Sequence, residues 1–383
     1  MNITPAKRLE NFPEYIFSKL NKAVMEVEKQ SGRNVLNLGT GNPNIKPSKK
    51  YIAKLQEYIA EPDAHIYPGY GPRPEFRDAL IAWHKKRFGV DLESDEVYQL
   101  IGEKDAIGML PLAFLNKGDE VLTPDPGYQG FAGPALMVGA KVITYDLLPT
   151  NEYKIDMREL KSKVTAKTKF MWVNFPSNPL GQIATLEELE QLIAFAKEHN
   201  IFIIYDNAYS EITFDGYVAP SILQIEGAKE VAVEINSFSK AYSFAGYRIG
   251  WIVGNKDIIA SLAKVKSQMD SGLAIPMQKL GAYALTHKDV AWHENMIRTY
   301  DARRKTVATY LSKLGLQSTL PKASLYIWAK IPNTETNSWT YSMKLLQEKQ
   351  ILVTPGTAFG KNGDRFVRVS ICGTIDEIDT YFA

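Results

Sequence analysis

The stretch IFIIYD, residues 201–206, determines the fold class that we expect for this chain. It is almost entirely apolar, without the alternation of apolar and polar residues that marks a strand with one wet face. Such a run is typical of a strand whose two faces are both covered, as in a parallel sheet. The run ends at Asp206, and ligands of open α/β sheets bind at the carboxyl ends of the strands.

Further strand patterns lie on both sides of this stretch. They are VYQLI (97–101), EVLTP (120–124), KVITYDL (141–147), KFMWVNF (169–175), VAVEINS (231–237) and YRIGWIVG (247–254). Helical patterns separate many of them, such as the one from Asp105 to Leu115 and the one that Thr185 and Glu188 open as a capping box. This alternation predicts an α/β fold with a mostly parallel seven-stranded sheet sandwiched by helices.

The pattern changes from Pro276 onward. Long helical periodicity runs to about Leu314, and short strands and a helix follow. In a chain of 383 residues two domains are expected. We predict a large domain over residues 31–285 and a smaller α+β domain formed by residues 1–30 and 286–383.

Composition excludes several classes of function. The net charge of +2 provides no strong field for nucleic acid, and no apolar run is long enough to span a membrane. The first residues, MNITPAKRLENF, do not form a signal peptide, and Cys372 is the only cysteine, so we expect a cytoplasmic protein. No metal site is expected, because the five histidines lack ligand spacing.

The segment SFSKAYSFAGYRIG, residues 237–250, carries the clearest chemistry. Lys240 stands between Ser239 and Ser243, and Arg248 follows eight residues later. A lysine amine condenses with an aldehyde, and hydroxyl and guanidinium groups bind a phosphate. An aldehyde and a phosphate in one molecule describe pyridoxal 5′-phosphate (PLP), so the segment predicts a PLP attachment site.

Three other segments place polar residues at the ends of predicted strands. VNFPSNPLG carries Asn174 and Asn178 between prolines that fix a turn, and YDNAYSEI carries Asp206 and Tyr209. GEKDAI, residues 102–107, lies between a strand and the start of a helix, where free backbone amides form an anion site. We expect these segments to meet the lysine segment at one edge of the sheet.

These segments resemble the fold type I, class I/II aminotransferases, which use PLP. The resemblance covers nearly the whole chain and follows the order of the family. It rests on LGTGNPN (38–44), YPGYGPRPEFR (67–77), DPGYQGF (125–131), NFPSNPLG, DNAYSEI, NSFSKAYSFAGYRIGW, TPGTAFG (354–360) and FVRVSIC (366–372). Within the family, DNAYSEITFDGY and GYVAPSILQIEGAKEVAVEINSFSK look most like the LL-diaminopimelate aminotransferase type.

The resemblance implies a role for each residue around the cofactor ring. Lys240 would hold PLP covalently and then move protons. Asp206 would pair with the pyridine nitrogen, while Asn178 and Tyr209 would bind the ring oxygen. Tyr128 would stack on the ring.

The resemblance also implies how the two anionic ends are bound. The phosphate would lie among Ser237, Ser239, Arg248 and the amides of Glu103 and Lys104, and Tyr67 would reach it across the interface of a homodimer. Arg368 would bind the substrate α-carboxylate beside Gly41 and Asn178, with Tyr15 on the substrate side.

Two positions depart from the family pattern. Glu103 stands where Gly-Ser-Lys or Gly-Ala-Lys is common, and its charge would repel a phosphate unless the side chain points away, so we expect only its amide to serve. Residues 244–247, FAGY, replace the commoner Met-Thr-Gly-Trp, which leaves phosphate binding intact but reshapes the pocket.

The expected function is a PLP-dependent aminotransferase that moves an amino group between an L-amino acid and a 2-oxo acid. Glutamate and 2-oxoglutarate would be one pair; a diaminopimelate-type, aspartate or aromatic amino acid would supply the other. A PLP-dependent C–S lyase on the same scaffold stays open, since shared motifs determine the cofactor and not the reaction. A PLP-binding regulator is the remote alternative, because no basic helical module precedes residue 36.

Overall fold

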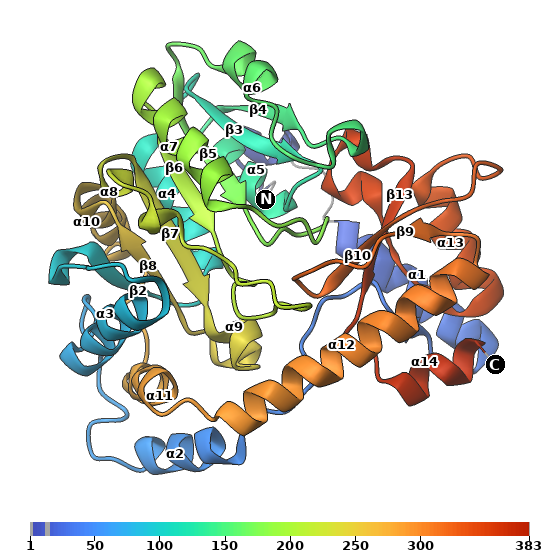
Figure 1. Ribbon diagram of the computed structural model, residues 1–383, viewed down its shortest axis with the longest axis horizontal. Helices are drawn as coiled ribbons and strands as arrows, with labels where there is room; N and C mark the ends of the chain where they lie inside the picture. The colour runs from blue at the N-terminus through green and yellow to red at the C-terminus, as the bar shows by residue number, and fades with distance from the viewer. Residues whose placement is uncertain (1–2, 12–15, 383) are drawn as a thin grey trace.

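The computed structural model describes residues 3–11 and 16–382. Its large sheet has the order β2-β8-β7-β6-β5-β3-β4. Strands β3 to β7 run parallel, and β8 pairs antiparallel with β7 and β2 (Figure 1). The strands are β2 (Val97–Leu100), β3 (Glu120–Asp125), β4 (Lys141–Asp146), β5 (Thr168–Asn174), β6 (Phe202–Asp206), β7 (Ala232–Ser237) and β8 (Gly250–Gly254). This seven-stranded, mostly parallel sheet confirms the predicted α/β class.

Strand β8 is shorter than the pattern over 247–254 predicted, because it begins only at Gly250. The residues before it form the 3-10 helix η6 (Ala245–Tyr247), and Arg248 has a left-handed backbone with φ of 55°. A left-handed residue cannot continue an extended strand. The chain therefore turns sharply after β7, and the turn includes the short helix α9 (Phe238–Ala241).

Helices cover both faces of the large sheet, and each face has its own core. Successive strand residues point to opposite faces, so Trp172 and Ile204 pack on one side while Met171 and Ile203 pack on the other. The first face is covered by α4 (Lys104–Phe114), α5 (Ala132–Met137) and α10 (Lys256–Lys266). The second is covered by α2 (Lys49–Ile59), α3 (Pro74–Phe88), α6 (Met157–Lys163), α7 (Leu186–His199), α8 (Ala228–Val231) and α11 (Ile275–Thr286).

A second, antiparallel sheet has the order β12-β13-β10-β9 and its own core. Its strands are β9 (Gln317–Ser318), β10 (Tyr326–Lys330), β12 (Thr354–Pro355) and β13 (Phe366–Ser370). The short strands β1 (Leu36–Asn37) and β11 (Ile351–Leu352) pair parallel beside it. The predicted domain division at residues 30 and 286 stays a prediction.

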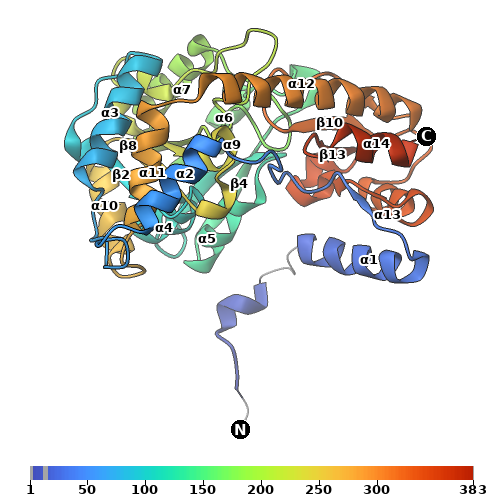
Figure 2. The same cartoon turned by 90° about the horizontal axis from the view of Figure 1, so that it is seen from below.

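Four helices accompany this second sheet. They are α1 (Ile16–Ser31), α12 (Val290–Lys313), α13 (Ser338–Lys349) and α14 (Ile375–Phe382). Helix α12 runs from the side of α11 and α2 to α14 (Figure 1), and α1 lies beside α13 (Figure 2), where Leu20 packs with Leu346 and Leu352. Helix α1 and the C-terminal helix α14 therefore both accompany the second sheet, whereas η1 (Lys7–Asn11) contacts α5. Within residues 3–11 and 16–382, no helix combines the length and apolarity that a membrane crossing needs.

A buried lysine joins α10 to the first turn of α4. The Lys266 side chain is 2% exposed, and its Nζ lies 2.5 Å from Asp105 Oδ2 and 2.6 Å from Asp270 Oδ2. Asp105 also accepts a hydrogen bond from the Ile101 N–H, so the ammonium group holds the turn between β2 and α4. Removing one member of a buried ion pair leaves an uncompensated charge, which costs more than the intact pair contributes.

We predict that Lys266→Ala lowers the free energy of unfolding by about 3 kcal/mol, because Asp105 and Asp270 lose their cation. Urea unfolding of the purified protein measures this loss. Lys264→Ala, on the exposed side of the same helix, is the matched control and should change stability by no more than about 0.5 kcal/mol. Equal losses in the two variants would contradict the role of the buried cluster.

Candidate functional site

A cavity of about 410 Å³ opens at the carboxyl ends of β5, β6 and β7, next to the second sheet. It brings together twelve of the residues singled out from the sequence. These are Gly41, Glu103, Lys104, Tyr128, Asn178, Asp206, Tyr209, Ser237, Ser239, Lys240, Arg248 and Arg368. Segments separated by more than 300 residues thus contribute to one site.

The register between the parallel strands β5 and β6 positions two polar residues beside the cavity. Asn174 on β5 pairs with Asp206 on β6, and the Asn174 side chain donates a hydrogen bond to the Asp206 carbonyl at 3.0 Å. The Asn174 side-chain oxygen accepts from the Asn178 N–H at 2.8 Å, so the turn after β5 is held against β6. Asp206 and Asn178 are both buried beside the cavity.

The carboxyl group of Asp206 lies deep in the site. It is 5% exposed, and its Oδ1 accepts a hydrogen bond from the Ala208 N–H at 3.2 Å. Burial raises the pKa of Asp206, while hydrogen bonds from the Glu103 side chain and the Ala208 amide act in the opposite direction. The Glu103 side chain thus turns to a carboxyl partner, and the expectation that only its amide serves the phosphate stays a prediction.

Lys240 presents its amine to the middle of the cavity from α9. Its Nζ donates to the Gly41 carbonyl at 3.2 Å and lies 5.9 Å from the centre of the Tyr209 ring. Only a glycine fits at position 41, because a Cβ atom there would lie 2.0 Å from the Tyr326 hydroxyl oxygen. The backbone at Gly41 can therefore reach Lys240 only without a side chain.

The side of the cavity predicted for a phosphate contains two helix starts. Ser237 and Ser239 begin α9, and the Ser237 hydroxyl accepts from the Ser239 N–H at 3.0 Å. Gly102 turns the chain into α4 with φ of 69°, and a Cβ atom there would lie 2.2 Å from Arg248 Nη2. Amide groups of a first helical turn and a guanidinium side by side form a binding site for an anion.

Arg368 is a buried cation with no acidic partner. It is 3% exposed, and its guanidinium donates to Asn178 Oδ1 at 2.8 Å and to the Gly39 carbonyl at 2.6 Å. No carboxylate pairs with it in the described part of the chain, and its buried Nε atom has no hydrogen-bond partner. A buried charge in this state is costly, so the arrangement is suited to an incoming carboxylate.

Several lining residues had not been predicted, and Tyr326 is the most important of them. Its ring centre lies 4.1 Å from the Arg368 guanidinium carbon, and its hydroxyl is hydrogen-bonded to that of Tyr209 at 3.1 Å. Burial raises the pKa of Tyr209 well above its usual value. Nothing in the sequence near Tyr326 marks it, because its position depends on β10 pairing with β13. Phe17, Asn21, Thr40 and Phe359 were missed in the same way.

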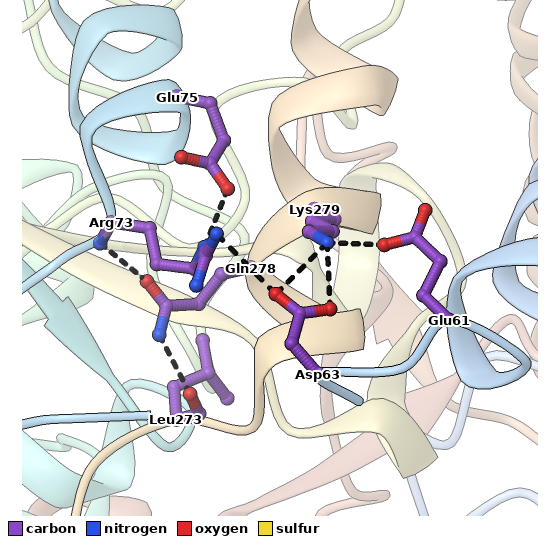
Figure 3. Close-up of polar contacts among 7 residues, drawn as sticks. All are labelled: Glu61, Asp63, Arg73, Glu75, Leu273, Gln278 and Lys279. Carbon is purple, nitrogen blue, oxygen red and sulfur yellow. Dashed lines mark hydrogen bonds and ion pairs between the residues drawn. The ribbon is translucent and has the colours of Figure 1, made fainter. Parts of the chain in front are cut away.

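Tyr67 does not line this cavity. It lies on a loop, and the residue is 85% exposed. The loop is fastened at both ends by α11. Lys279 binds Glu61 and Asp63 before it, and the Gln278 side chain accepts from the Arg73 N–H after it at 2.8 Å (Figure 3). The loop thus presents Tyr67 to the outside in a defined position.

The remaining predictions concern Tyr15 and metals. Tyr15 lies outside the described residues. Within those residues, no group of three or more His, Cys, Asp or Glu side chains is arranged to hold a metal ion.

Comparison with known proteins identifies the family. Residues 33–382 match the model of the family described as aminotransferase class I and II. The LL-diaminopimelate aminotransferase of Halothermothrix orenii is 37% identical, covering 97% of this chain and 95% of its own length. LL-diaminopimelate aminotransferase 2 of Trichormus variabilis is 39% identical, covering 96% and 94%.

A solved structure agrees with these matches. The structure described as apo-BacF from Bacillus subtilis superposes with a TM-score of 0.94 at 33% identity, and the match covers 100% of this chain and 97% of that one. None of these comparisons favours the lyase alternative. The chain belongs to the class I and II aminotransferases, and it is an enzyme that moves an amino group between an amino acid and a 2-oxo acid.

Proposed function

We propose that the cavity binds PLP and that Lys240 is the residue to which the cofactor attaches. One observation carries this proposal: the Lys240 amine lines the same cavity as a buried acid, Asp206, and a guanidinium, Arg368, that has no carboxylate partner among the described residues. Bound PLP would supply an aldehyde that condenses with an amine and a ring that stabilises a carbanion. The protein would supply the anchors and the proton carrier.

The residues present fit the cofactor group by group. Ser237, Ser239, Arg248 and the first amides of α4 would hold the phosphate. Asp206, which is buried in the cavity, would pair with the ring nitrogen. Tyr128 would stack on the ring, while Asn178 and Tyr209 would hydrogen-bond the ring oxygen.

Substrate binding in this proposal depends on Arg368. The guanidinium would donate two parallel hydrogen bonds to the α-carboxylate, beside the backbone of Gly41. This anchor would bring the substrate Cα within reach of Lys240 Nζ. The amine would move the proton from Cα to the cofactor in the first half of the reaction, and from the cofactor to Cα of the second substrate in the other half.

The substrate pairs follow from the lining and from the relatives. Glutamate and 2-oxoglutarate are proposed as one pair, and LL-diaminopimelate, on which two relatives are named to act, is the first donor to test. Lys104 lines the cavity and would contact a distal carboxylate. Aspartate and aromatic amino acids complete a screen of donors against 2-oxoglutarate.

A cytoplasmic location is proposed from the single cysteine.

A homodimer with shared sites is proposed from the exposed loop. Tyr67 and Tyr70 are 85% and 57% exposed, although the loop itself is anchored by Lys279 and Gln278. An anchored loop that exposes two tyrosines is suited to contact a second copy, where Tyr67 would reach the phosphate of the partner's cofactor.

Lys240→Ala should remove the long-wavelength absorbance of bound cofactor and all transaminase activity, because the amine that forms the covalent link is lost. Absorbance spectra with added PLP and a coupled assay for glutamate measure both effects. Lys104→Ala is the control, since it removes the other cavity lysine and should keep the absorbance. An active, coloured Lys240→Ala variant would refute the site.

Arg368→Lys should raise KM for every amino donor by about tenfold or more, because a lysine cannot form the two parallel hydrogen bonds of a guanidinium. Cofactor affinity should stay unchanged. Steady-state kinetics and cofactor titration separate the two. Arg365→Lys is the matched control, because Arg365 bonds backbone carbonyls away from the cavity. An unchanged KM in Arg368→Lys would contradict the carboxylate role.

Shared sites predict complementation between two inactive variants. Mixing Tyr67→Ala and Lys240→Ala chains forms hybrid dimers in which one site has both defects and the other has none. After random reassembly, activity should recover to about a quarter of the native value. Full activity of Tyr67→Ala alone, or no recovery in the mixture, would contradict the proposal.

A further inference from the structure

Glu103 is a partly buried acidic residue beside the place where the site is expected to bind a phosphate. It begins α4 as the N-cap residue, yet its side chain makes no capping hydrogen bond. Its Oε1 atom is fully enclosed, and none of the N–H or O–H groups in the described chain donates to it. An ionised carboxylate enclosed without donors is among the most costly buried groups, so the charge state of Glu103 needs an explanation.

The partner of this side chain is another carboxyl group. Glu103 and Asp206 are hydrogen-bonded side chain to side chain. Ionised carboxylates only accept hydrogen bonds, so one member of such a pair must carry a proton. Asp206 also accepts from the Ala208 N–H, whereas the enclosed Glu103 Oε1 accepts from no N–H in the described residues, and the proton therefore belongs on Glu103.

The surrounding charges agree with this assignment. The charged groups facing Glu103 are Asp206 at the end of β6, Lys240 on α9 and Arg248 after η6. Burial, and then the Asp206 carboxylate, raise the pKa of Glu103 well above its usual value, although both cations act against this shift. No ion pair joins Glu103 to either cation within the described residues, so neither neutralises an ionised form by direct contact.

We propose that Glu103 is a positioning residue that works as a neutral acid, donating a hydrogen bond to Asp206 and keeping that carboxylate charged and aimed at the cofactor ring. This inference rests on the proposed function, because the cofactor gives Asp206 its role. A neutral Glu103 also removes the conflict noted from the sequence, since an uncharged acid beside the phosphate site repels no anion.

The test is to observe the proton directly and then replace the acid by its neutral counterpart. Infrared spectra of the cofactor-free protein at pH 8 should contain the carbonyl band of a protonated carboxyl group, and Glu103→Gln should lack it. Glu187→Gln is the matched control, because Glu187 also lies in the first turn of a helix but is exposed. A spectrum without this band would overturn the inference.

The loaded enzyme provides the second measurement. Glutamine is neutral and also donates a hydrogen bond, so Glu103→Gln should leave the PLP dissociation constant within about twofold and the pH midpoint of the cofactor absorbance within about 0.3 unit of the native values. Were Glu103 ionised, its removal would tighten PLP binding by about tenfold or more and lower that midpoint by about one unit. Those shifts would overturn the inference.

The pH dependence of the stability of the cofactor-free protein provides a third test. The pKa of Glu103 is higher in the folded state than its ordinary value of 4.5, so the folded protein binds more protons and native stability falls as pH rises above that value. The unfolding temperature of Glu103→Gln should therefore exceed that of the native protein by a margin that grows from pH 5 to pH 8. A constant margin would overturn the inference.

If the native protein fails to bind PLP at all, the proposed function fails, while the infrared and stability results still decide the state of Glu103.

Discussion

The register between β5 and β6 is the constraint on which the site depends. Asn174 and Asp206 face each other across these parallel strands, and the Asn174 side chain bonds both the Asp206 carbonyl and the turn at Asn178. Side-chain direction alternates along a strand, so a shift of one residue would turn Asp206 away from the cavity. Lys240 reaches the cavity from α9, directly after β7, which pairs with β6. Arg368 reaches it from β13, because the second sheet lies next to the strand ends.

The cavity contains charged and acidic side chains whose burial lowers the stability of the protein when no ligand is bound. Arg368 is buried without a carboxylate partner in the described residues, and Asp206 and Glu103 are two acids that share one hydrogen bond. Such groups lower the stability of the free protein, and they regain free energy when charges of opposite sign arrive. Binding of the proposed cofactor and substrate would therefore compensate the stability lost at these positions.

Much of the fold and of the site was predictable from sequence, because the signals are local. Apolar strand runs, the Thr185–Glu188 capping box and the residues around Lys240 each show within a few positions. Other features depend on contacts between distant segments. Tyr326 reaches Arg368 through strand pairing, and the inward turn of Glu103 depends on a partner on another strand.

Attachment of PLP to Lys240, where these segments meet, is the proposal on which the other roles depend. Borohydride reduction of the PLP-loaded protein, followed by digestion and mass analysis, tests it most directly. We expect one pyridoxyl group per chain, on the peptide that contains Lys240. A reduced protein without this group, or with the group on Lys104, the other lysine of the cavity, would contradict it.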